Sequence, residues 1–177
     1  GVEQPIWSAR LEVGHASGDR YRDDDEFSGR ALHPDFNVGL LLYEEVLAAK
    51  TAQSWTPDAR GFWSQGGVYD SSYVSLQGKL RPLAGAEIVG LVLFAMPNQI
   101  EASIVASECD QNDAPDDCNP NALAGPLGLE TDLALRLDFQ RYFKGVLEGG
   151  VRFPMAGLGE IGSGLPWTLQ TRLAMVF

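Results

Sequence analysis

The chain has 177 residues and a formal net charge of -11. This length suits one domain and is short for two. The acidic excess, without a basic stripe, argues against a nucleic-acid partner, because phosphates are neutralised by lysine and arginine. The longest apolar run, 88–96, is far shorter than the roughly 20 residues of a membrane-spanning helix. A helical membrane protein is therefore excluded, but spanning β-strands are not, since only every second residue of such a strand must be apolar.

Acidic residues cluster in two runs, 23–26 and 110–117. Blocks of like charge usually form solvated loops. The carboxylates of the second run also suit a hard cation such as calcium, but the run lacks the spacing and glycine of an EF-hand loop. We therefore expect a solvated loop, no metal and no cofactor.

The only two cysteines, Cys109 and Cys118, flank this second run. Two cysteines so close together, among Asp, Asn and Pro, suit a small disulfide-closed loop in an oxidising compartment. A zinc site would need four ligands, and neither His15 nor His33 lies near them in the sequence. A disulfide is the prediction, with free thiols as the alternative.

Alternation of apolar with polar or small residues predicts six β-strands, because side chains in a strand point to opposite faces in turn. The first strand is 7–14, with one wholly apolar face. The second is 73–81, and the third, 87–96, is apolar on both faces. The fourth, 129–140, alternates most regularly. The fifth and sixth are 147–153 and 167–177.

The doubly apolar third strand needs a cover, and the segment 38–50 is the candidate. In it, Val38, Leu42, Val46 and Ala49 fall on one side at helical spacing. A short helix that folds inward, an ordinary surface helix and an additional strand are all compatible with this pattern. If the segment folds inward, it places Glu44 and Glu45 at a constriction.

Long and short connections alternate strictly along the chain. About fifty residues separate the first two strands and about thirty the third and fourth, unusual lengths in a compact soluble domain. The links at 82–86 and 141–145 are short. Outer-membrane barrels have short periplasmic turns and long extracellular loops. We therefore interpret 18–67 and 97–126 as extracellular loops, the first as the one that could enter the lumen and the second as the one with the disulfide.

The closing run, Trp167 to Phe177, resembles the C-terminal strand of outer-membrane β-barrel proteins. The resemblance implies that Phe177 belongs to the signal read by the barrel-assembly machinery. Three further segments, 33–47, 68–73 and 147–154, resemble alginate-export-like barrels, including a group found in deltaproteobacteria. The resemblance covers most of this chain but only the last part of such a barrel.

These observations predict an all-β, antiparallel transmembrane β-barrel segment in the bacterial outer membrane, with residues 1–177 as one unit. Six strands do not close a bacterial barrel, since the smallest have eight. Open sheet edges also leave unsatisfied backbone groups in a bilayer. We expect the remaining strands to come from the same polypeptide or another chain, and outer-membrane lipid and the assembly machinery to be the other partners.

Alternation assigns the apolar side chains Leu133, Leu135 and Leu173 to lipid and a mixed set of charges to the lumen. The predicted pore-lining residues are Arg10, Glu12, Lys79, Arg81, Glu130, Asp132, Arg136, Asp138, Glu148, Arg152 and Arg172. An alginate channel should instead have a basic lumen, so another solute is expected.

The expected function is a porin-like channel for polar solutes such as saccharides. The alternative is a structural barrel that anchors or builds an envelope complex, with the inner charges paired to fill the interior. Catalysis is not expected, because His15 and the nearby Ser17 are poorly placed to form a nucleophile–base pair.

Overall fold

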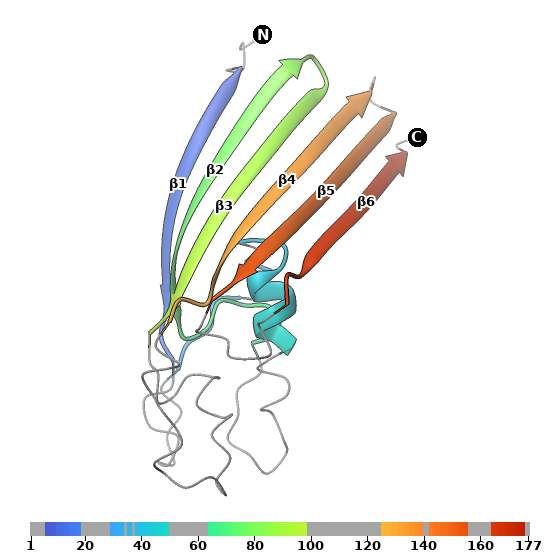
Figure 1. The fold of residues 1–177 in the computed structure, drawn as a ribbon. Helices are drawn as coiled ribbons and strands as arrows, with labels where there is room; N and C mark the ends of the chain where they lie inside the picture. The colour runs from blue at the N-terminus through green and yellow to red at the C-terminus, as the bar shows by residue number, and fades with distance from the viewer. Residues whose placement is uncertain are drawn as a thin grey trace, which may run out of the picture.

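The computed structural model describes residues 6–18, 29–33, 35–36, 38–49, 64–98, 125–139, 142–155 and 164–175. In this part of the chain, six antiparallel strands form one open sheet in sequence order (Figure 1). They are β1 (Trp7–Ala16), β2 (Ser71–Leu83), β3 (Ala86–Pro97), β4 (Gly128–Phe139), β5 (Phe143–Pro154) and β6 (Trp167–Met175). The prediction of an all-β chain with six antiparallel strands is confirmed.

In the part of the chain that the structure describes, helix is almost absent. One short helix of the π type, η1 (Leu42–Leu47), is found among the described residues. No helix in these ranges has both the length and the apolar character needed to cross a membrane.

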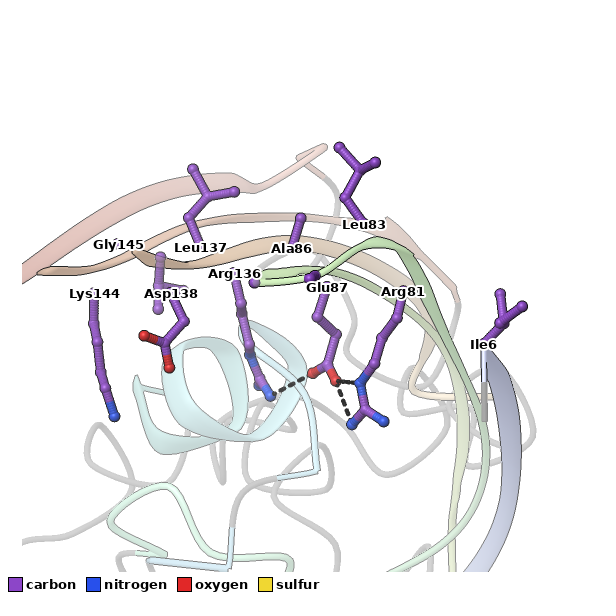
Figure 2. Close-up of a pocket in the computed structure, with 13 residues that line it drawn as sticks. Ile6, Arg81, Leu83, Ala86, Glu87, Arg136, Leu137, Asp138, Lys144 and Gly145 are labelled. Atoms are coloured by element: carbon purple, nitrogen blue, oxygen red, sulfur yellow. Dashed lines mark hydrogen bonds and ion pairs between the residues drawn. The ribbon is translucent and has the colours of Figure 1, made fainter. Parts of the chain in front are cut away.

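The pleat and the register together define two faces of the sheet. Leu133 of β4 lies opposite Gly90 and Gly149, whereas its neighbour Asp132 lies opposite Leu91 and Gly150 on the other face. The sheet is curved, and Figure 2 shows charged side chains such as Arg136 pointing to the concave side and Leu83 and Leu137 pointing to the convex side.

The convex face is apolar and exposed over its whole width. Leu133 is 62% exposed and Leu173 is 69% exposed. Leu135 lies on the same face but is half-buried. Exposed large apolar side chains come from all six strands: Trp7, Leu11, Val13, Val74, Leu76, Leu80, Leu83, Val92, Met96, Leu133, Phe139, Leu147, Phe153, Trp167, Leu169, Leu173 and Met175.

The short connections are tighter than the sequence predicts. The β2–β3 turn is Ala84–Gly85 rather than 82–86, because a register shift between Leu80 and Leu83 accommodates Pro82 within the strand. Gly85 adopts a φ of 82°, which favours glycine, and its carbonyl accepts a hydrogen bond from the Asp138 N–H at 2.7 Å. Strand β5 also starts earlier than expected, at Phe143. Both differences come from strand pairing that continues to the ends of the hairpins.

The buried core lies on the concave face, at the end of the sheet opposite the short turns. Here residues 38–49, which we term the inner segment, pack against β2, β3 and β4 (Figures 1 and 2). The contacts bury Leu42, Tyr43 and Leu47 together with Leu93 and Ala95 of β3. The inner segment therefore covers part of the apolar concave surface of β3.

The buried side of the inner segment differs from the expected one. The spacing predicts that Val38, Leu42, Val46 and Ala49 share one side, yet Val46 is only partly buried and Ala49 is exposed. The buried positions instead include Leu41, Leu42, Tyr43 and Leu47. The cause is the π-type hydrogen bond from the Val46 N–H to the Leu41 carbonyl, at 2.9 Å, which spans five residues rather than four.

Candidate functional site: the concave face

Strand alternation brings all eleven charged residues predicted to line a pore to the concave side of the sheet. Glu130 of β4, for example, lies opposite Leu93 of β3 and Arg152 of β5. The eleven are not equally accessible. Glu130 and Arg152 are 0% and 1% exposed, respectively, while the side chains of Arg10 and Arg172 are each 69% exposed.

Near the short turns, the concave face holds a cavity of about 700 Å³. Its charged lining residues are Arg81, Glu87, Arg136, Asp138 and Lys144. The Glu87 carboxylate accepts from Arg81 Nε at 2.9 Å and from Arg136 Nη1 at 3.3 Å, so two arginines share one carboxylate (Figure 2). The guanidinium groups remain more exposed than the carboxylate between them. Sequence reasoning did not select Glu87, although its alternation with Ile88 places it on the charged face.

Two further ion pairs lie on the concave side. Arg10 Nη2 lies 2.5 Å from Glu12 Oε2, and the Tyr73 hydroxyl donates to Glu12 Oε1 at 2.7 Å. The other pair joins Arg172 of β6 to Glu148 of β5. These charges thus partly compensate one another on the concave face of the sheet.

At the opposite end, Glu130 holds the inner segment through its backbone. Its Oε1 accepts from the N–H groups of Leu40 at 2.5 Å and Leu41 at 2.8 Å, and its Oε2 accepts from that of Leu42 at 2.6 Å. Asp132 Oδ2 receives a longer bond, 3.2 Å, from the Leu40 N–H. One buried carboxylate thus satisfies three consecutive donors that the short helix itself cannot satisfy.

Two glycines permit this close approach. A Cβ atom added at Gly39 would lie 2.7 Å from Glu130 Oε1, and one added at Gly150 would overlap the Asp132 carboxylate. Any side chain at either position would therefore displace the inner segment or the carboxylates that contact it.

Arg152 supplies a positive charge beside the buried Glu130. It is the cross-strand partner of Glu130, and its Nη1 donates to the Leu127 carbonyl at 3.2 Å. Burying an isolated charge is very unfavourable. The cost is lower here because Glu130 of β4 and Arg152 of β5 carry opposite charges on adjacent strands.

Tyr43 provides a second polar contact between the inner segment and the sheet. Its hydroxyl lies 3.1 Å from Ser71 Oγ, and its ring meets that of Tyr73 edge to face, with centroids 6.0 Å apart. Burial raises the pKa of the Tyr43 hydroxyl above its ordinary value. The hydroxyl therefore stays protonated and remains available for hydrogen bonding.

The acidic side chains of the inner segment are more accessible than its apolar ones. Glu45 is exposed and Glu44 is half-buried. Burial, followed by the negative charges of Glu45, Glu130 and Glu148, raises the pKa of Glu44. The concave face is therefore acidic near η1, whereas cations predominate near the short turns.

A hydrogen-bonded trio of His15, Ser72 and Asn98 was not found from the sequence. His15 Nδ1 lies 2.9 Å from Ser72 Oγ, and the Ser72 hydroxyl donates to Asn98 Oδ1 at 2.6 Å. Asn98 Nδ2 donates to the Ala16 carbonyl, which fixes the orientation of the amide. The serine proton is therefore directed to the amide and not to the imidazole. This geometry ties β1 to Asn98, the residue that follows β3, but does not activate Ser72 as a nucleophile.

Several predicted features lie outside the described residues: Cys109, Cys118, the acidic run 110–117 and Phe177. The disulfide and the assembly signal therefore stay predictions. Within the described ranges, no group of three or more His, Cys, Asp or Glu side chains is arranged to hold a metal ion.

Comparison with known proteins adds no relative. No protein-family model matches the sequence, and no match was found among curated proteins or solved structures.

Proposed function

We propose that this chain forms part of the wall of a bacterial outer-membrane β-barrel that acts as a porin-like channel for polar solutes such as saccharides. The observation that carries the proposal is the contrast between the two faces. Apolar side chains are exposed on the convex side of every strand, while the concave side holds ion pairs and a charged cavity.

The convex face fits lipid better than water. Monomeric soluble proteins rarely expose contiguous apolar patches larger than a few hundred Å². Here such side chains extend over six adjacent strands, among them Trp7, Leu133 and Leu173. The strands have 9 to 13 residues, comparable to the roughly 9–11 residues of a tilted strand that crosses a bilayer.

The concave face fits a water-filled lumen. Exposed guanidinium groups and carboxylates of both signs would hydrate a pore wall and orient polar solutes. Resemblance of three segments to alginate-export-like barrels agrees with a transport role, whereas the mixed charges favour a solute other than alginate. The assembly machinery, outer-membrane lipid and the remaining strands of the wall are the proposed partners.

The inner segment is the proposed constriction. It lies on the concave face and presents Glu44 and Glu45 near one end of the wall. Carboxylates at a constriction attract cations and repel anions. Deletion of residues 38–49 should therefore raise single-channel conductance and weaken cation preference.

A structural barrel without transport is the second candidate. The ion pairs Arg10–Glu12 and Arg172–Glu148 and the packing of the inner segment favour it, because paired charges and a covered core can fill an interior. In that case the protein would anchor or build an envelope complex.

Two measurements on the intact protein test these proposals. Heat-modifiable migration in detergent is expected for a membrane barrel, and its absence would contradict the membrane assignment. Stepwise conductance in planar bilayers is expected for the channel. A heat-modifiable protein that conducts no ions would favour the structural barrel.

A further inference from the structure

We propose that Glu130 is the positioning residue that anchors the inner segment to the concave face and so sets the width and cation preference of the pore. Its own carboxylate is fully buried and lies outside the path of any solute. The effect on conductance rests on the proposed channel function, but the anchoring itself does not.

The anchor is directional, unlike the packing around it. Leu42, Leu47 and Leu93 belong to one buried apolar cluster, and apolar packing of this kind is non-directional and tolerates small displacements along the sheet. By contrast, three bonds of 2.5, 2.8 and 2.6 Å from consecutive N–H groups fix both the position and the orientation of the chain relative to Glu130.

No nearby group in the described contacts reproduces these bonds. Asp132 reaches only the Leu40 N–H, at 3.2 Å. Leu41 and Leu42 are 3% and 0% exposed, so water cannot replace the carboxylate without opening the contact. Loss of the Glu130 acceptor should therefore release the inner segment rather than leave it in place with buried, unsatisfied donors.

The anchor can be weakened from either side. Glu130→Gln keeps the shape of the side chain but removes its charge and turns one acceptor into an amide donor that faces an N–H group. Gly39→Ala leaves the strands untouched and instead places a methyl group 2.7 Å from Glu130 Oε1. Glu87→Gln is the matched control, since it neutralises a concave carboxylate near the short turns, away from the inner segment.

The experiment combines amide hydrogen exchange with bilayer conductance on the same preparations. In the wild-type protein, the amides of Leu41 and Leu42 should be protected. In both Glu130→Gln and Gly39→Ala they should exchange at least tenfold faster. Single-channel conductance should rise toward the value of the 38–49 deletion, and cation preference should fall. Glu87→Gln should leave the exchange of these amides unchanged.

The outcomes separate the anchor from the channel. Retained amide protection in both variants would overturn the anchor, whether or not the protein conducts. Faster exchange of the Leu41 and Leu42 amides with unchanged conductance would overturn the inference that Glu130 sets the width of the pore. A wild-type protein without conductance would refute the channel, and with it the effect on conductance, while the exchange data would still test the anchor. If Glu130→Gln fails to fold, Gly39→Ala decides the matter, because its substitution lies outside the sheet.

Discussion

Replacement of Leu133 by arginine tests the membrane assignment at the middle of the wall. Leu133 is the sixth of the twelve residues of β4 and is 62% exposed on the convex face. Six residues to the end of the strand, at Phe139, correspond to about 20 Å along the strand and about 14 Å along the membrane normal at a 45° tilt. That is about half the thickness of the hydrocarbon layer, so Leu133 should lie near the midplane.

A cation at the midplane of a barrel's lipid face costs about 2–4 kcal/mol, and one near the interface about 0–1 kcal/mol. Leu133→Arg should therefore reduce the folding equilibrium constant in lipid vesicles by about 30- to 700-fold. Phe139→Arg, at the strand end, is the matched control and should have a much smaller effect.

The assay is reversible denaturant unfolding of the intact protein in vesicles of defined thickness. In water, an exposed leucine replaced by arginine normally changes stability by less than about 0.5 kcal/mol. Equal and small effects of Leu133→Arg and Phe139→Arg would therefore refute a lipid-facing convex surface.

Three other outcomes are expected. Tyr43→Phe should lower the free energy of unfolding by about 1–3 kcal/mol, because it removes the hydrogen bond between the Tyr43 hydroxyl and the buried Ser71 hydroxyl. An unchanged unfolding midpoint would contradict this. Cys109 and Cys118 should resist a thiol reagent until they are reduced, with up to about 3 kcal/mol of loop stabilisation from chain entropy; labelling before reduction would refute the disulfide. Glu44 has a higher pKa in the folded protein than in the unfolded chain, so proton binding to Glu44 stabilises the fold below the ordinary glutamate pKa. This stabilisation is lost as the pH rises through the raised pKa. Glu44→Gln should therefore raise the melting temperature at neutral pH and have little effect well below the ordinary glutamate pKa. A rise in melting temperature that does not depend on pH would contradict the raised pKa of Glu44.

The faces of the strands were predictable because the pleat is local. Leu129 to Phe139 alternate in the sequence as they alternate between the two faces of β4. The ends of the hairpins were not predictable. Pro82 is typical of a turn, and it remains in β2 only because it lies beside a register shift. A local pattern carries no information about how far the neighbouring strand continues the pairing.

The sequence pattern predicted which charged residues lie on the concave face, but not which residues they contact. Alternation places Glu130 on the charged face, yet it does not indicate that residues ninety positions earlier would cover it. The only local hint is Gly39, which leaves room for a close approach just before an apolar run. Similarly, the partner of His15 is Ser72 on the next strand and not the nearby Ser17, because cross-strand register brings the two together.

The two free edges of the sheet restrict how any closed wall could be completed. Five antiparallel pairings separate β1 from β6, so these edge strands run in opposite directions (Figure 1). A ring with antiparallel neighbours throughout can then accept only an even number of additional strands, since an odd number would place two parallel strands side by side at the closing seam. This parity holds whether the added strands come from the same polypeptide, from a second copy or from another protein. A partner that supplies all the missing strands must therefore contribute an even number of them, and a single added strand is incompatible with such a ring.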